Sequence, residues 1–119
     1  MARPTWKLTV RAGSEVDQDD FEDLAEAVAS MRERALRIRA EGPPKTSKFI
    51  RTFAPGDQVT ARLELSTGGF LRRKTAAGID VRGDGTFVPY RGGLRREELD
   101  PSGHDTPFDL VRETLEGDR

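Results

Sequence analysis

Residues 23–42 read DLAEAVASMRERALRIRAEG, and this stretch decides the fold class. Its apolar residues recur at steps of three and four, which places them on one side of an α-helix; they are Leu24, Ala27, Val28, Met31, Ala35 and Ile38. Asp20 or Asp23 can cap the start, and Asp23 has Glu26 three residues later, as in a capping box. Gly42 and the two prolines after it cannot continue the helix. The stretch predicts one long amphipathic helix with one buried face.

Alternation of apolar and polar residues predicts strands on both sides of this helix. Before it, WKLTVR at 6–11 is typical of a half-buried strand, and EVDQ at 15–18 is a candidate for a short second one. After it, QVTARLELS at 58–66 alternates most regularly, with Val59, Ala61, Leu63 and Leu65 expected to face inward. Three further extended segments are expected at 48–54, 70–82 and 86–92.

A short second helix is predicted near the end of the chain, at TPFDLVRETLEG (106–117). Thr106 is its expected N-cap and Asp109 completes a capping box, with Pro107 at the first helical position. Its expected buried face consists of Phe108, Val111 and Leu115.

Together these elements predict an α+β fold, a two-layer sandwich with an antiparallel sheet of about four to six strands packed on one long helix. A short C-terminal helix completes it. At 119 residues the chain fits a single domain, 1–119, with a tail from about residue 98 that is loosely attached or packs back on the basic middle of the chain.

The stretch DVRGDG at 80–85 predicts a hairpin tip. With Asp84-Gly85 as a two-residue turn, Val81 pairs with Val88 and Ile79 with Tyr90, so these four residues form the core face. A three-residue loop would instead bring Phe87 to the side of Val81. The adhesion tripeptide Arg-Gly-Asp at 82–84 is interpreted as part of this turn, because three-residue motifs are common by chance.

Motifs for catalysis, metals and cofactors do not emerge from the residues. The chain has no cysteine, and its one histidine, His104, lies in the polar loop PSGHDTP before the second helix. A calcium loop at 80–91 would have Arg82 and Arg91 at ligand positions. The acidic run at 15–23 could hold magnesium but is more typical of a solvated helix start. We expect no metal, no cofactor and no catalytic set.

Charge is distributed unevenly, although the net charge is only −1. Residues 43–97 carry 11 basic and 5 acidic groups, whereas residues 98–119 carry 2 basic and 7 acidic groups. A basic middle can form a polyanion site. Candidate nucleic-acid contacts on a basic sheet face are Arg62, Arg72, Arg73, Lys74, Arg82 and Arg91, with Phe70, Phe87 or Tyr90 as candidate stacking rings.

Membrane insertion and export are not indicated by the sequence. The chain has no apolar run approaching about 18 residues, the length that a transmembrane helix needs. MARPTWKLTV at 1–10 has no apolar stretch typical of a signal peptide. We therefore expect a cytoplasmic protein without a membrane partner.

Residues 6–35 together with ARLELS at 61–66 and GIDVRGDGTFVPYRG at 78–92 resemble small uncharacterised proteins of actinobacteria, a family without an assigned activity. The hairpin ending at Phe21 and the helix opening EDLAEA at 22–27 are also similar to the AP2-like domains of phage integrases. Those domains place three strands before their helix, whereas one or two are expected here. The resemblance transfers no binding residue.

The function itself is not determined by the sequence. The leading hypothesis is a non-catalytic interaction or accessory domain with a protein partner, or a homodimer formed through a sheet edge or the helix. The alternative is a nucleic-acid-binding module that uses the basic sheet face. The third is an enzyme with an unrecognised site built from carboxylates and arginines.

Overall fold

The computed structural model describes residues 5–42, 59–67, 75–92 and 96–117. Along the chain these residues form β1 (Trp6–Ala12), β2 (Glu15–Phe21), α1 (Leu24–Glu41), β3 (Val59–Thr67), β4 (Ala76–Arg82), β5 (Phe87–Arg91), β6 (Glu97–Glu98) and α2 (Pro107–Gly117). The predicted strand at 48–54 and the triplet Arg72, Arg73 and Lys74 lie outside the described residues.

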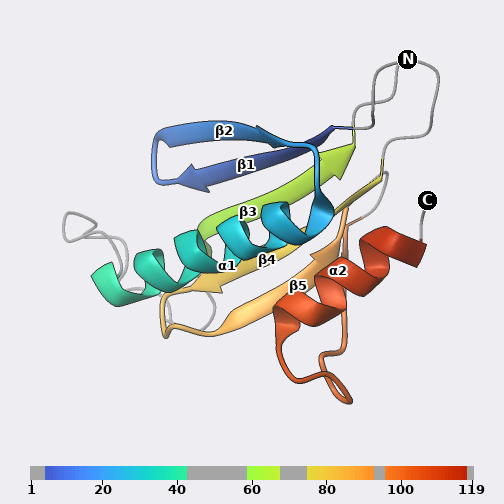
Figure 1. Ribbon diagram of the computed structural model, residues 1–119. Coiled ribbons are helices and arrows are strands. Elements are labelled where there is room, and N and C mark those ends of the chain that lie inside the picture. Colours follow the sequence, from blue (N-terminus) through green and yellow to red (C-terminus); the bar gives the residue numbers. More distant parts are fainter. Residues whose placement is uncertain (1–4, 43–58, 68–74, 93–95, 118–119) are drawn as a thin grey trace.

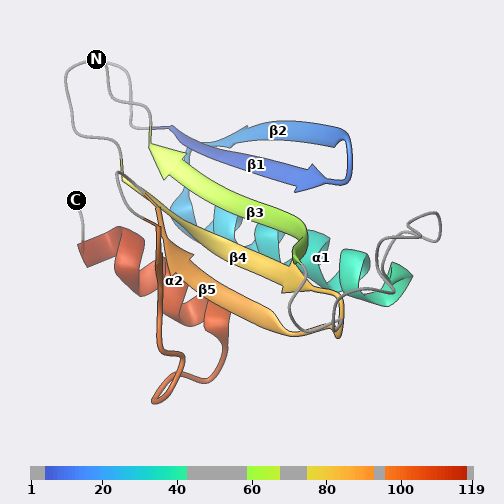
Figure 2. The same cartoon turned by 180° about the vertical axis from the view of Figure 1, so that it is seen from behind.

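The six strands form one antiparallel sheet in the order β2-β1-β3-β4-β5-β6. Both helices lie on the same face of this sheet (Figure 1). The opposite face carries neither helix (Figure 2). The predicted α+β sandwich is therefore confirmed, with a long helix and a short C-terminal helix sharing one layer.

Helix α1 begins and ends as its sequence predicts. Asp23 is the N-cap, and its side chain accepts a hydrogen bond from the Ala25 backbone N–H. Gly42 ends the helix at a φ of 77°, and its backbone N–H donates to the carbonyls of Ile38 and Arg39. Helix α2 opens with the predicted capping box, in which Thr106 and Asp109 each accept from the other's backbone N–H.

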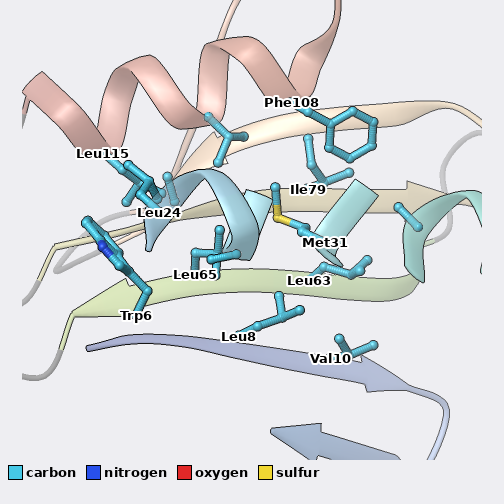
Figure 3. Packing of buried hydrophobic residues seen from close by; sticks show 14 of the residues in the cluster. Trp6, Leu8, Val10, Leu24, Met31, Leu63, Leu65, Ile79, Phe108 and Leu115 are labelled. Atoms are coloured by element: carbon cyan, nitrogen blue, oxygen red, sulfur yellow. The ribbon is translucent and has the colours of Figure 1, made fainter. Parts of the chain in front are cut away.

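The hydrophobic core lies between the helices and the sheet (Figure 3). Alternate residues of β1 and β3 point into it, including Trp6, Leu8, Leu63 and Leu65, all nearly inaccessible to solvent. The helices close this layer with the residues Leu24, Ala27, Met31, Ala35, Phe108, Val111 and Leu115. The prediction that Val59 faces inward is wrong. Val59 is 45% exposed because the pairing of β3 with β4 shifts between Val59 and Ala61.

The second predicted strand is longer than expected, because β2 pairs with all seven residues of β1. Every residue of β2 before Phe21 is exposed, since β2 is an edge strand that pairs on one side only. Asp17 and Asp19 of the acidic run form ion pairs with Arg34 of α1, at 3.0 and 3.8 Å. These two carboxylates thus join an edge strand to the helix.

The β4–β5 hairpin has the three-residue loop, so the two-residue register is wrong. Gly85 adopts a φ of 89°, its N–H donates to the Arg82 carbonyl at 2.9 Å, and Arg82 pairs with Thr86. This is a turn followed by a glycine bulge, a common three-residue hairpin connection. Val81 consequently lies opposite Phe87.

The shift by one residue reverses the faces of β5. Phe87 turns toward the helices and meets Phe108 edge-to-face, with ring centroids 5.4 Å apart. Val88 and Tyr90, which the two-residue turn would place in the core, lie on the face opposite the helices, as partners of Asp80 and Gly78. This reversal creates the site described next.

Candidate functional site

The sheet face that the helices leave uncovered, called the open face below, is charged. Strand alternation brings to it one residue in two from each central strand. Its charged and aromatic members among the described residues are Lys7, Arg11, Asp20, Arg62, Glu64, Asp80, Arg82, Tyr90, Arg96 and Glu98.

Asp80 is the centre of this face, because it is a fully buried carboxylate. Its Cα partner on β3 is Arg62, whose Nε donates to Oδ1 at 2.8 Å and whose Nη2 approaches Oδ2 at 3.4 Å. Arg96, just before β6, contacts the same Oδ2 through Nη2. A buried carboxylate needs such partners, since an unpaired charge in the interior is strongly unfavourable. Asp80 thus fixes two arginines from distant parts of the chain.

Tyr90 forms the second half of the cluster. It lies opposite Gly78 on β4, and its hydroxyl donates to Glu64 Oε1 on β3 at 2.9 Å. The ring can cross β4 because Gly78 has no side chain: a Cβ there would lie 2.9 Å from the Tyr90 oxygen and would collide with the Leu63 carbonyl. Burial raises the pKa of the Tyr90 hydroxyl far above its ordinary value, and the neighbouring Glu64 carboxylate raises it further. The hydroxyl is therefore a fixed hydrogen-bond donor near neutral pH.

The two arginines also rest on the Tyr90 ring. The guanidinium carbons of Arg96 and Arg62 lie 4.7 and 5.5 Å from its centroid, within the range of cation–π attraction. Burial lowers the pKa of Arg96, and the neighbouring Arg62 lowers it further, yet an arginine stays charged at physiological pH. Asp80 and Tyr90 together hold Arg62 and Arg96 in place, and this unit is called the arginine clamp below.

The arginine clamp is balanced in charge but keeps exposed edges. Arg62 and Arg96 offset Asp80 and Glu64, while 40% and 36% of the two arginine side chains stay exposed. Arg11 of β1 is the Cα partner of Arg62 on its other side, and adds a further positive charge beside it. Glu98 of β6, the Cα partner of Tyr90, adds a carboxylate near Arg96, so the exposed guanidinium edges lie in a surface of mixed charge.

Other ion pairs limit the positive charge elsewhere on the open face. Arg82 Nη2 donates to Glu98 Oε1 at 3.0 Å, so the arginine of the Arg-Gly-Asp tripeptide forms an ion pair with β6. Asp84 of the same tripeptide accepts from the Thr86 backbone N–H at 2.9 Å, and hydrogen bonding with the Thr86 side chain, together with this backbone bond, lowers the pKa of Asp84. Both side chains support the hairpin.

Only part of the predicted basic set comes together. Arg62 and Arg82 share the open face, whereas Arg91 alternates with Tyr90 and pairs with Ala77 and Glu97. The stacking role predicted for two of the aromatic residues does not fit, because Tyr90 is 1% exposed and Phe87 packs on Phe108. Phe70 lies outside the described residues.

No sequence motif predicted that four residues of the arginine clamp and its surroundings come together; they are Asp80, Glu64, Tyr90 and Arg96. One signal was present: a single carboxylate in the otherwise apolar run AAGIDV at 76–81, two residues after a glycine. A charge inside a central strand requires a partner on the neighbouring strand. The correct hairpin register would then have placed Tyr90 opposite that glycine.

His104 sits in the loop before α2, as predicted, and its Nε2 lies 2.8 Å from Glu113 Oε2. This hydrogen bond raises the pKa of His104, and a contact between Nδ1 and the Ser102 carbonyl adds to the rise. Among the described residues no three His, Asp or Glu side chains cluster in a way that could hold a metal ion. None of the helices within 5–42, 59–67, 75–92 and 96–117 is long and apolar enough to cross a membrane.

Comparison with protein-family models, with curated proteins and with solved structures found no match. The resemblance to small actinobacterial proteins therefore stays a prediction. Two strands precede α1, one fewer than in the AP2-like integrase domains.

Proposed function

We propose that this chain is a non-catalytic, cytoplasmic interaction domain that binds an acidic segment of a partner protein on its open face. The observation that carries the proposal is the arginine clamp. Its two guanidinium groups are fixed from below by Asp80 and Tyr90, yet more than a third of each side chain is exposed.

Fixed arginines favour binding for an entropic reason. Immobilising a long side chain at an interface costs about 0.5–1.5 kcal/mol, and that loss is reduced when the free protein already holds it in place. Arg62 uses Nε and Nη2 for Asp80, and a guanidinium has five N–H donors, so donors stay available to a second carboxylate. Arginine is also one of the residue types that dominate the energy of protein interfaces.

A binding role fits this cluster better than a catalytic one. A general acid or base works best with a pKa near the working pH, whereas burial moves the pKa of Tyr90 away from neutrality. Both Asp80 oxygens are engaged by Arg62 and Arg96, an arrangement typical of a structural carboxylate.

Nucleic-acid binding is the second candidate, and one observation favours it. Lys7 and Arg11 lie four residues apart on the same face of β1, and Arg62 lies directly beside Arg11, so three cations occupy this part of the open face, with Asp20 beside Lys7. Against it, Arg82 is already paired with Glu98. The described aromatic rings of β5 offer no exposed face on which bases could stack.

The proposal is tested with an array of Asp- and Glu-rich peptides, each beside a counterpart in which Asn and Gln replace the acids. We expect the acidic peptides alone to bind, and affinity for the best of them to fall roughly tenfold or more in Arg96→Ala and Arg11→Glu. Arg112→Glu on the outer side of α2 is the matched control and should bind normally. Equal binding of acidic and amide peptides would refute the proposal.

The same variants distinguish nucleic-acid binding from binding of an acidic peptide. Fluorescence anisotropy with mixed-sequence RNA and DNA fragments would show tight binding that falls steeply with salt if the open face holds phosphates. We expect weak binding of both fragments at low salt. Nucleic-acid affinity above that of every acidic peptide, lost in Arg11→Glu, would replace the acidic partner by a polynucleotide.

A further inference from the structure

Helix α1 lies on the helical face, away from the open face (Figure 1). Its outer side bounds a shallow groove. The groove has a volume of about 350 Å³ and is closed on one side by Phe108 and the start of α2. Ala25, Ala29 and Leu36 supply apolar surface along its floor, and Arg32 and Glu33 lie between them. Leu36 is 37% exposed, a large value for a leucine on a helix that packs on a sheet.

Spacing makes this surface a second helical stripe. Ala25, Ala29, Arg32 and Leu36 follow one another at steps of four, three and four, so they share one side of α1. The first stripe packs on the sheet through Leu24, Ala27, Met31 and Ala35. The second stripe combines two alanines and a leucine with Arg32, and such an exposed, partly apolar stripe is suited to contact a second partner.

We propose that the groove receives the same helix of a second copy, in an antiparallel pair around a two-fold axis near residues 32 and 33. That axis sets Arg32 against the partner's Glu33, and each such ion pair occurs twice. It also sets Ala29 against the partner's Leu36, so that a large side chain enters the space above a small one. Charge and shape are therefore both self-complementary along this stripe.

Glu33 can pair with the partner's Arg32 because the ion pair that Glu33 forms within its own chain is weak. It contacts Arg37 at 3.4 Å one turn along the helix, and both side chains are more than 60% exposed. Exposed pairs of this kind contribute little to stability. A partner's arginine beside the apolar stripe would compete with that contact.

The sheet edges are poorer surfaces for self-association. Edge strand β2 exposes Glu15, Asp17, Asp19 and Asp20, and an antiparallel pair of two such strands would bring carboxylates together. The opposite edge, β6, has two residues and both are glutamates. The groove on α1 is the surface in the described part of the chain whose charges attract their own copy.

Such a dimer leaves both open faces accessible, because they lie on the far side of each sheet (Figure 2). The pair would present two arginine clamps and could bind a partner with two acidic segments by avidity. The dimer does not depend on the acidic partner, so the two proposals fail separately. A single helix pair buries less than a standard interface, and we expect a dissociation constant on the order of 10 µM or weaker.

Sedimentation velocity of the whole protein at several loading concentrations tests the dimer. We expect reversible association that weakens roughly tenfold in Arg32→Glu and in Glu33→Arg, because each dimer then gains two like-charge pairs. The double variant Arg32→Glu/Glu33→Arg restores both ion pairs and should recover association. Leu36→Asp should abolish it, and Lys7→Glu on the open face is the matched control.

Circular dichroism melts of each variant establish that it is folded, which is expected because all the changed residues are exposed. A protein that stays monomeric at the highest concentration would overturn the dimer. Association that survives Leu36→Asp, or a charge-swapped double variant that associates no better than its two single variants, would overturn it as well.

Discussion

Replacing Asp80 by Asn removes the charge at the centre of the arginine clamp and keeps the volume of the side chain. Hydrogen bonds to charged groups contribute about 1.5–3 kcal/mol each. The Asn oxygen can still accept from Arg62 Nε, but its amide N–H₂ would face the N–H donors of Arg96. The two arginines, 40% and 36% exposed, can recover some hydration. We therefore expect a loss of about 2–3 kcal/mol in the free energy of unfolding, below the upper range for a broken buried pair.

Urea unfolding followed by tryptophan fluorescence measures this loss, because Trp6 is the only tryptophan and is 2% exposed. The midpoint should fall with an unchanged slope, and thermal unfolding should begin about 10 °C lower. Asp19→Asn, an exposed acid in a weak pair with Arg34, is the control and should change stability by less than about 0.5 kcal/mol. Arg96→Ala should then cost less in the Asp80→Asn background than in the original protein. An Asp80→Asn variant as stable as the control would refute the reasoning.

Gly78→Ala should lower the free energy of unfolding by about 3 kcal/mol or more in the same urea assay, since the new Cβ collides with the Leu63 carbonyl. A loss below about 1 kcal/mol would contradict this close packing of β3 and β4. Gly85→Val should cost about 2 kcal/mol, because a β-branched residue rarely adopts a φ of 89°, and unchanged stability would contradict the hairpin loop. For His104, whose pKa is raised chiefly by the hydrogen bond with Glu113, the stabilisation is complete below the unfolded pKa of about 6.5 and is lost as pH rises through the folded pKa. An NMR titration should show a lower His104 pKa in Glu113→Gln, and equal values would rule out the contact.

Both helices could be predicted from sequence because local chemistry sets their ends. Asp23 and Gly42 delimit α1, and the reciprocal pair Thr106 and Asp109 opens α2. The apolar stripe of α1 needs only the helical period, so it too follows from sequence. The sandwich is then the arrangement that buries that stripe on the alternating strands.

The hairpin register could not be predicted, because RGDG allows two loop lengths that differ by one residue. The choice decides whether Tyr90 lies in the core or crosses Gly78 on the open face. The arginine clamp depends on that choice and on Arg96 reaching Asp80 from another segment. The number of basic residues in the sequence does not predict the arginine clamp either, since that number does not show which arginines have carboxylate partners.

Binding of an acidic partner as proposed requires the arginines of the open face to be rigid before any partner binds. ¹⁵N relaxation of arginine Nε–H groups in the free protein measures this, with exposed Arg37 as an internal reference. We predict an order parameter for Arg62 near the rigid-backbone value of about 0.85, and one for Arg37 below about 0.6. An Arg62 as mobile as Arg37 would contradict the account, because the open face would then hold no preformed binding surface.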